Sequence, residues 1–172
     1  SISSDTTWTS DTVYVVTGNM VVENGATLTV DPGTRVEFDG AGAWYILIKG
    51  TLIAQGTASE KIVFTSQATN PSAGDWGYLK FFDESTDATI DAGENYVSGT
   101  ILEQCLFEYG EGISVHDCYP YLSSLEVRNN SGIDNGAVSL NYSSAGSDAS
   151  KTIYVKNCVI SSNSSSGLYI ND

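Results

Sequence analysis

Short apolar strands return along this chain at an interval in the twenties. Residues 25–64 contain two copies of one pattern, in which apolar and polar residues alternate between turns rich in Gly, Pro and Asp. Leu28 and Leu52 hold equivalent places in the two copies and are 24 positions apart. A repeat of this length is typical of a solenoid, in which each turn of the chain stacks on the one before. We therefore expect Leu28 to lie over Leu52, and Phe38 to lie near Phe64.

The second half of the chain keeps this pattern. The segments that begin at Cys105, Leu125 and Cys158 each place two apolar side chains two residues apart, and therefore on one face of a strand. Each segment reaches a Gly or Asn three residues after the second apolar position. Gly and Asn tolerate the left-handed backbone of a sharp corner. We expect such corners at Gly110, Asn130 and Asn163.

The three cysteines are too few for a fold held together by disulfides. Cys105 and Cys158 hold equivalent places two repeats apart, so two strand spacings, roughly 9–10 Å, should separate them. A disulfide requires the two Cα atoms to lie within about 7 Å of each other. We therefore expect both residues to face inward, buried and reduced.

The two ends of the solenoid need a cover, because unpaired strand edges recruit other strands. Residues 1–12 are polar apart from a few apolar groups, of which Trp8 is the largest, and we expect them to form an N-terminal arm or cap. At the other end, Leu168–Ile170 should open a coil that remains incomplete at residue 172. We expect other copies of the chain, or the rest of a longer parent chain, to cover that end.

The charge balance limits the partners that this chain can have. The 21 acidic residues exceed the seven Lys and Arg, which gives a formal net charge of −14. Such a chain repels the phosphate backbone of nucleic acids and anionic lipid. No apolar run approaches the roughly 20 residues that span a bilayer. We expect no nucleic-acid partner, no membrane insertion and an extracellular or cell-surface location.

The family resemblance rests on several of these segments. Gly25–Phe38, with Leu-Thr-Val-Asp-Pro-Gly-Thr at its centre, together with Gly50–Gly56, Ile62–Ser66 and Gly74–Gly77, resembles the right-handed parallel β-helix repeat proteins of secreted bacterial and archaeal origin, which have the pectate-lyase-like fold. The resemblance implies an all-β fold. It predicts a right-handed, single-stranded parallel β-helix of roughly six coils, in a single domain over residues 1–172. Members of this group include polysaccharide lyases, glycosidases, adhesins and spacers, so the resemblance leaves the function open.

An acidic loop carries the clearest chemical signal. Between Asp83 and Glu94, oxygen-bearing side chains stand at the first, third, fifth, ninth and twelfth places, with a backbone carbonyl available at the seventh. This is the spacing of an EF-hand calcium loop, although Ala88 stands where that loop needs Gly for its bend. The alternative is an acidic, solvated loop between coils. The predicted Ca²⁺ ligands are Asp83, Ser85, Asp87, Thr89, Asp91 and Glu94.

Several aromatic and titratable residues are candidates for glycan-binding or catalytic groups. Rings that could stack on sugars are those of Trp44, Tyr45, Trp76, Tyr78, Tyr119 and Tyr121, although core filling explains them equally well. His116 lies next to Asp117 and Cys118, but neighbouring side chains of a strand point to opposite faces, so a structural or surface histidine is expected. No pair of carboxylates for acid catalysis and no basic residue beside a calcium site stands out.

Two functional classes remain open. The first is an extracellular structural or adhesive module, which could stack on itself as a subunit of a fibre or surface protein. The alternative is a carbohydrate-active domain that binds or cleaves polysaccharide and, if it is an enzyme, acts as a polysaccharide lyase or glycoside hydrolase. Uneven insertions on a regular coil often carry the activity of such folds. Three insertions are expected, at Gln67–Asp75, Asp83–Ser98 and Ser143–Ser150.

Overall fold

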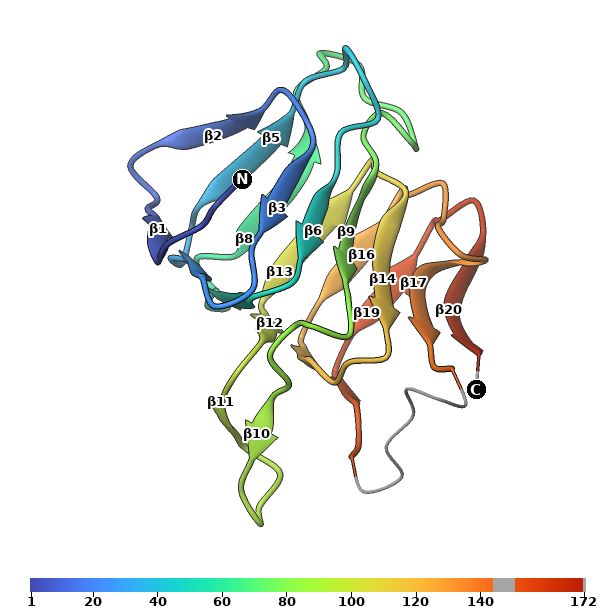
Figure 1. Ribbon diagram of the computed structural model, residues 1–172. Coiled ribbons are helices and arrows are strands. Elements are labelled where there is room, and N and C mark those ends of the chain that lie inside the picture. The colour runs from blue at the N-terminus through green and yellow to red at the C-terminus, as the bar shows by residue number, and fades with distance from the viewer. Residues whose placement is uncertain (144–150, 172) are drawn as a thin grey trace.

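The computed structural model describes residues 1–143 and 151–171 and shows a right-handed parallel β-helix (Figure 1). Three six-stranded parallel sheets run along it. Sheet A consists of β3 (Met20–Val22), β6 (Ile46–Ile48), β9 (Tyr78–Phe81), β14 (Gly112–His116), β17 (Gly136–Asn141) and β20 (Ser166–Asn171). Sheet B consists of β1 (Thr6–Trp8), β4 (Thr27–Val30), β7 (Thr51–Gln55), β12 (Ile101–Glu103), β15 (Tyr121–Ser123) and β18 (Tyr154–Lys156). Sheet C consists of β2 (Val13–Val16), β5 (Arg35–Phe38), β8 (Ile62–Ser66), β13 (Cys105–Glu108), β16 (Glu126–Arg128) and β19 (Val159–Ser161).

Each coil supplies one strand to sheet B, then one to sheet C and one to sheet A, which makes six coils. An antiparallel hairpin of β10 (Thr89–Ile90) and β11 (Tyr96–Ser98) leaves the body between the third and fourth coils (Figure 1). Leu168–Ile170 lies in β20, the third strand of the sixth coil, so the expectation that it opens a new coil was wrong. The described residues contain no helix, and therefore no helix long and apolar enough to cross a membrane.

Rows of inward-facing side chains fill the space between the sheets. Because the strands pair in parallel register, equivalent residues of successive coils stack on one another. The central row of sheet A contains Val22, Ile48, Phe81, Val115 and Leu140, all of them fully buried. Burying one such side chain contributes roughly 1.5–3 kcal/mol, so the repeated rows account for most of the fold's stability.

The predicted register is confirmed in one sheet and wrong in the next. Leu28 pairs with Leu52, as expected. Phe64 pairs with Val36, while Phe38 pairs with Ser66, two residues further along. The corner between β7 and β8 is four residues longer than the corner between β4 and β5, so equal spacing did not hold across it.

All three cysteines are free thiols. Cys105 is fully buried and pairs with Ile62, and the register carries its position on to Leu125 and Cys158 in the following coils. The predicted inward row is therefore confirmed. Cys158, however, is only partly buried, because the sixth coil has a neighbouring coil on one side of it.

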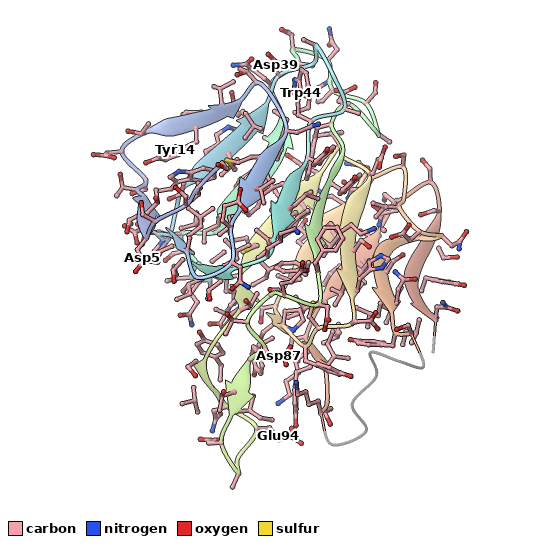
Figure 2. The ribbon with its side chains drawn as sticks, in the orientation of Figure 1. Asp5, Tyr14, Asp39, Trp44, Asp87 and Glu94 are labelled. Atoms are coloured by element: carbon pink, nitrogen blue, oxygen red, sulfur yellow. The ribbon has the colours of Figure 1, made fainter. Side chains whose placement is uncertain are left out.

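The N-terminal segment is part of the first coil as well as its cover. Trp8 lies in β1, is 8% exposed and stacks on Tyr14 with ring centres 4.7 Å apart. Asp5 accepts a hydrogen bond from the Thr27 N–H group at 2.9 Å, and Figure 2 places Asp5 and Tyr14 at this end of the stack. Ile2 extends sheet A by one parallel bridge beside β3. The segment predicted as an N-terminal arm or cap therefore contains the first strand of sheet B.

The corners of coils four to six use left-handed residues that are not glycine. Between sheets B and C, Gln104, Ser124 and Asn157 have φ values of 51–54°. Between sheets C and A, the left-handed residues are Tyr109, Asn129 and Ser162, each one position before the predicted corner. The predicted left-handed conformation at Gly110, Asn130 and Asn163 was therefore wrong by one residue.

Candidate functional site at the corner between sheets A and B

The connections from sheet A to sheet B, here called the A–B corner, vary greatly in length. Residues 23–26, 49–50 and 117–120 make short turns, whereas residues 82–100 contain the hairpin. Residues 142–153 make a second long connection, of which 144–150, including most of the predicted Ser143–Ser150 insertion, lie outside the described residues. Figure 2 shows Asp87 and Glu94 of the hairpin region far from Asp39 and Trp44, which lie at the corner between sheets C and A.

The hairpin is closed by its own turn. The Asp91 carboxylate accepts hydrogen bonds from the Gly93 and Asn95 N–H groups at 2.8 and 2.9 Å. An Asp side chain that binds the backbone two residues on defines an Asx-turn, which reverses the chain. The hydrogen bonds, above all that from the Asn95 N–H, lower the pKa of Asp91.

Contacts with sheet B hold the hairpin against the outer face of that sheet. The Ala88 N–H group donates to the Tyr119 carbonyl at 2.9 Å, and Lys156 forms a 3.0 Å ion pair with Glu94. Ile101 and Tyr121, which point outward from sheet B, are consequently 0% and 8% exposed. The hairpin therefore covers an apolar patch and has a defined position on the coil.

The six predicted calcium ligands are distributed along this region. Ser85 is buried and lies 3.4 Å from the hydroxyl of Thr100, while Thr89 is exposed on β10. Asp83 is exposed where the chain leaves sheet A, and Asp91 caps the turn at the far end of the hairpin.

The remaining two predicted ligands have partners of opposite charge. Asp87 pairs with Lys151 at 2.5 Å, and Glu94 pairs with Lys156. Within residues 1–143 and 151–171, no group of three His, Cys, Asp or Glu side chains is arranged to hold a metal ion. Calcium binding by this loop stays a prediction, and it would require these ion pairs to rearrange.

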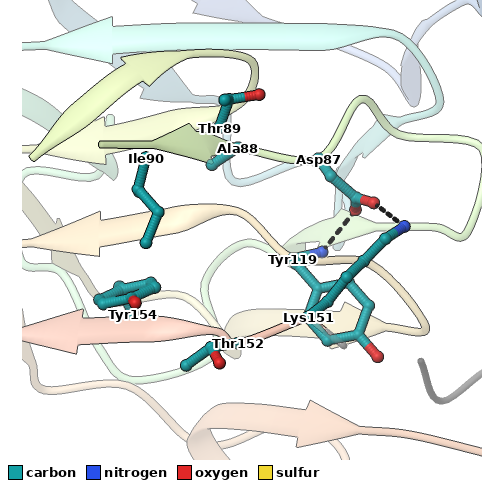
Figure 3. A pocket seen from close by; sticks show the side chains of 8 residues that line it. All are labelled: Asp87, Ala88, Thr89, Ile90, Tyr119, Lys151, Thr152 and Tyr154. Carbon is teal, nitrogen blue, oxygen red and sulfur yellow. Dashed lines mark hydrogen bonds and ion pairs between the residues drawn. The ribbon is translucent and has the colours of Figure 1, made fainter. Parts of the chain in front are cut away.

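A pocket, here called the first pocket, lies between the base of the hairpin and sheet B (Figure 3). It holds about 400 Å³ and is lined by Asp87, Ala88, Thr89, Ile90, Tyr119, Lys151, Thr152 and Tyr154. Figure 3 shows the Ile90 side chain pointing toward the Tyr154 ring. The two side chains together form an apolar wall. Asp87 forms the polar side, where it accepts a hydrogen bond from the Tyr119 N–H at 2.8 Å and pairs with Lys151. An apolar wall with a few fixed polar groups is typical of sites for small organic ligands.

A smaller pocket, the second pocket, lies at the same corner on the side of sheet A. It holds about 240 Å³ and is lined by His116, Asp117, Asn141, Tyr142, Ser143 and Asn171. His116, Asn141 and Asn171 are equivalent residues of three successive strands. The Asp117 carboxylate accepts hydrogen bonds from the Ser143 N–H at 2.6 Å and from its hydroxyl at 3.0 Å. The residues of this row carry imidazole and amide groups, and Asp117 adds a carboxylate beside them.

His116 is held by a carboxylate on the outer face of sheet A. Its Nε2 atom lies 2.9 Å from Asp134 Oδ2, which also accepts a 2.6 Å hydrogen bond from the Ser114 hydroxyl and lies 3.4 Å from Lys80 Nζ. Partial burial acts to raise the pKa of Asp134, but the hydrogen bonds from Ser114 and His116 and the charge of Lys80 outweigh it and lower the pKa. Cys118 is 1% exposed, and burial raises the pKa of its thiol, which disfavours the nucleophilic thiolate.

Most of the aromatic residues proposed from the sequence pack against other groups. Trp76 is fully buried and stacks on Phe38 with ring centres 4.0 Å apart. Tyr45 and Tyr78 stack on each other at 5.0 Å on the outer face of sheet A, which covers one face of each ring. Tyr119 is the member of the proposed set that lines the first pocket.

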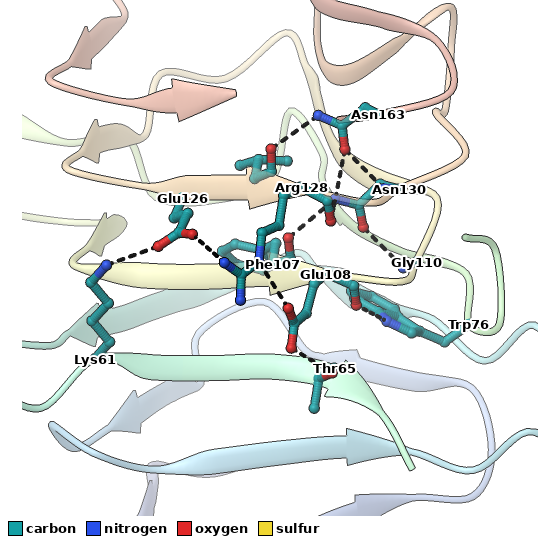
Figure 4. A network of polar contacts seen from close by, with 11 residues as sticks. Lys61, Thr65, Trp76, Phe107, Glu108, Gly110, Glu126, Arg128, Asn130 and Asn163 are labelled. Carbon is teal, nitrogen blue, oxygen red and sulfur yellow. Dashed lines mark hydrogen bonds and ion pairs between the residues drawn. The ribbon is translucent and has the colours of Figure 1, made fainter. Parts of the chain in front are cut away.

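The outer face of sheet C carries a structural network of charges (Figure 4). Arg128 bridges Glu108 at 3.0 Å and Glu126 at 2.7 Å, and Lys61 binds the other oxygen of Glu126 at 3.0 Å. These ion pairs link strands β13 and β16 to Lys61, the residue before β8, and so extend across three coils. They cross-link neighbouring coils along the outer face of sheet C.

A buried asparagine holds the corner between sheets C and A (Figure 4). Asn130 is fully buried, accepts a hydrogen bond from the Gly110 N–H at 2.9 Å and donates to the Phe107 carbonyl at 3.1 Å. The Asn163 side chain continues the row by accepting from the Asn130 N–H at 2.8 Å. The asparagines predicted as left-handed corners therefore act through their side chains, which bind backbone groups of the adjacent coil.

Sequence reasoning missed several residues that line the two pockets: Ile90, Lys151, Thr152, Tyr154, Asn141 and Asn171. A signal for Tyr154 was present, because it pairs with Tyr121 in the preceding coil. Extending the alignment of the second half to the strands of sheet B would have found it.

The chain was also compared with known proteins. A family model described as "Pectate-lyase like beta helix domain" matches residues 1–124, which extend from the first coil to the end of β15 in the fifth. No match was found among curated proteins or among solved structures.

Proposed function

The chain belongs to the family of pectate-lyase-like β-helix domains, and from this membership we propose that it is an extracellular or cell-surface adhesive module that binds polysaccharide in the first pocket. The observation that carries the proposal is the pocket itself, of about 400 Å³, with the Tyr154 ring and Ile90 on one side and the Asp87–Lys151 pair on the other. A sugar has an apolar face that can lie on a ring and hydroxyl groups that hydrogen-bond to a fixed carboxylate and ammonium.

Binding is a better account of this pocket than cleavage. Acid-catalysed hydrolysis of a glycosidic bond uses two carboxylates on opposite sides of the bond. Among the described lining residues the first pocket offers one, Asp87, whose two oxygens are engaged by Lys151 and by the Tyr119 N–H group. Such a group is well placed to orient a sugar hydroxyl.

The test is calorimetric titration with hexasaccharides of β-1,4-glucan, xylan, mannan and galacturonate. We expect at least one to bind, and Tyr154→Ala to weaken binding tenfold or more, because truncating a central aromatic contact costs over about 1.4 kcal/mol. Tyr45→Ala is the matched control, since Tyr45 is also an outward-facing, stacked tyrosine but lies far from the pocket on sheet A. Loss of binding with Tyr45→Ala alone, or no binding by any hexasaccharide, contradicts the proposal.

A structural role is a second candidate, favoured by the sixth coil. The inward-facing side chains of Leu168 and Ile170 are 42% and 60% exposed, and within residues 1–143 and 151–171 no strand pairs with the outer edge of β20. Exposed apolar groups beside an open strand edge form a surface on which another strand can pair. We propose a second copy of the chain as the occupant. Light scattering after size exclusion should show self-association that Ile170→Asp abolishes, and a monomer at all concentrations would refute it.

A further inference from the structure

The two pockets at the A–B corner are linked by a pair of stacked rings. Tyr119 lines the first pocket and Tyr142 lines the second. Their rings stack with centres 5.3 Å apart and an angle of 24° between the planes. The Tyr142 hydroxyl is fixed by a 3.3 Å hydrogen bond to the Cys118 carbonyl. This stacked pair therefore contributes one ring to each pocket.

The two pockets differ in chemistry. The first combines the apolar wall of Ile90 and Tyr154 with one ion pair. The second offers the carboxylate of Asp117 and the amides of Asn141 and Asn171, which are hydrogen-bonding groups in successive coils. Rings suit the apolar face of one sugar, and a row of amides and carboxylates suits the hydroxyls of the sugars that follow it along a chain.

Charge limits which sugar chain can occupy both pockets. Each pocket contains a carboxylate, Asp87 in the first and Asp117 in the second, and the protein has a formal net charge of −14. Lys151 neutralises Asp87, whereas Asp117 is bound by the hydroxyl and N–H group of Ser143, which carry no charge. A uronate placed in the second pocket would meet a like charge, which disfavours it.

We propose that the first and second pockets are adjacent subsites for one ligand, a neutral linear oligosaccharide that lies along the A–B corner across the Tyr119–Tyr142 pair. This inference rests on the proposed glycan-binding function and specifies its ligand. The first subsite holds one sugar against Tyr154. The second subsite binds the hydroxyls of the next sugars through Asn141 and Asn171.

The experiment measures affinity against chain length by calorimetry. The probes are glucose, cellobiose, cellotetraose and cellohexaose, with the matching xylose and mannose series and hexagalacturonate. For the neutral series that binds, we expect the affinity to rise at least tenfold from the monosaccharide to the tetrasaccharide. Hexagalacturonate should bind more weakly than the neutral hexasaccharide.

Substitutions separate the two subsites. Asn171→Ala should lower tetrasaccharide affinity threefold or more while leaving monosaccharide affinity unchanged, and Tyr154→Ala should weaken both. Asn171 is exposed near the end of β20, so its truncation should preserve the fold, which an unchanged melting temperature would verify. Asn24→Ala, at an exposed turn of the first coil, is the matched control.

The outcomes distinguish the two proposals. Equal affinity for all chain lengths, with no effect of Asn171→Ala, would overturn the two-subsite inference and leave glycan binding by the first pocket standing. Tighter binding of hexagalacturonate than of every neutral hexasaccharide would overturn the neutral-ligand assignment. Failure of all saccharides to bind would overturn both proposals.

Discussion

The A–B corner and the corner between sheets B and C each connect a strand of one sheet to a strand of the next, but with connections of very different length. In coils four to six, the chain passes from sheet B to sheet C through one left-handed residue, such as Gln104. The A–B corner of the same part of the molecule carries the hairpin, both pockets and a connection over residues 142–153. The comparison shows that the coil needs only one well-packed corner to keep its register, which leaves another corner free to accept insertions.

Left-handed residues other than glycine occur at both of these corners. A left-handed conformation costs a non-glycine residue roughly 1–2 kcal/mol, and here it recurs at the same corner in successive coils, at Gln104, Ser124 and Asn157. Stacking of the buried rows on either side holds these residues in place. The A–B corner contains left-handed residues as well, Glu94 in the hairpin turn and Asp117 in the next coil, with φ values of 60° and 53°. Hydrogen bonds from Asn95 to the Asp91 carboxylate close the turn around Glu94.

The largest expected effect comes from a closely packed glycine at the third corner of the coil, between sheets C and A. A Cβ atom on Gly110 would lie 2.5 Å from the Trp76 ring, which is fully buried against Phe38 and cannot move away. We expect Gly110→Ala to destabilise the protein by about 3 kcal/mol, a drop in melting temperature of roughly 6–12 °C. Calorimetry measures it.

Gly40→Ala provides the matched control for this substitution. Gly40 belongs to the corner between sheets C and A in the second coil. No atom lies within 4 Å of a Cβ added there. Its effect should stay within about 0.5 kcal/mol. Equal losses from the two substitutions would mean that the fourth coil is not packed more tightly at this corner than the second.

Sequence periodicity was sufficient to predict a stacked coil, because stacking repeats one inward row in every coil, and the family resemblance predicted the right-handed parallel β-helix. Leu28 over Leu52, and the alignment of Cys105 with Leu125 and Cys158, needed only the spacing of apolar residues. The position of Phe38 was wrong because four inserted residues at one corner shift the register without disturbing the alternation on either side.

The candidate site could be predicted only in part. The acidic loop was located correctly, and Asp87 and Thr89 do line the first pocket. The pocket was not foreseen, because it needs Tyr154 and Lys151 from a coil more than 60 residues later in the chain. Such residues meet only once the number of coils between them is known, and irregular corners hide that number.

Calcium binding by the acidic hairpin loop at the A–B corner should have an intermediate effect on stability. The ion must displace Lys151 from Asp87 and Lys156 from Glu94, so its dissociation constant should be on the order of 1 mM, as in extracellular modules. At 10 mM Ca²⁺ the folded state should gain about 1.4 kcal/mol, which raises the melting temperature by roughly 3–6 °C. EDTA should reverse the increase.

Two controls make the calcium measurement specific. Asp91→Asn keeps the atom that accepts the turn hydrogen bonds but removes a charged ligand, so it should reduce the increase. Mg²⁺ has the same charge but requires a stricter octahedral geometry, and it should have a smaller effect. An unchanged melting temperature in Ca²⁺, or an equal increase with Mg²⁺, would leave the loop as an acidic hairpin without a calcium site.

The smallest expected effect concerns two glutamates whose pKa values shift in opposite directions, one on the outer face of sheet C and one at the corner between sheets C and A. The pKa of Glu126 is lowered, chiefly by the hydrogen bond from Lys61, and this outweighs the opposing effect of partial burial. The pKa of Glu111 is raised by burial and by the nearby charge of Asp134. A lowered pKa stabilises the folded state above the group's ordinary pKa, and the contribution disappears as the pH falls through the lowered value. A raised pKa has the opposite consequence, because the charged form is disfavoured in the folded state and acidification relieves the cost.

The two glutamates should therefore respond oppositely to neutral substitution. At pH 7, Glu126→Gln should lower the free energy of unfolding and Glu111→Gln should raise it, each by less than about 1 kcal/mol because both side chains are partly exposed to solvent. Both differences should shrink as the pH is lowered toward 3, since protonation makes each glutamate neutral like the glutamine that replaces it. Urea unfolding at pH 7, 5 and 3 measures these changes. If Glu111→Gln also destabilises at pH 7, then Glu111 is held by its surroundings as Glu126 is, and the contrast between a paired outer face and a desolvated corner does not hold.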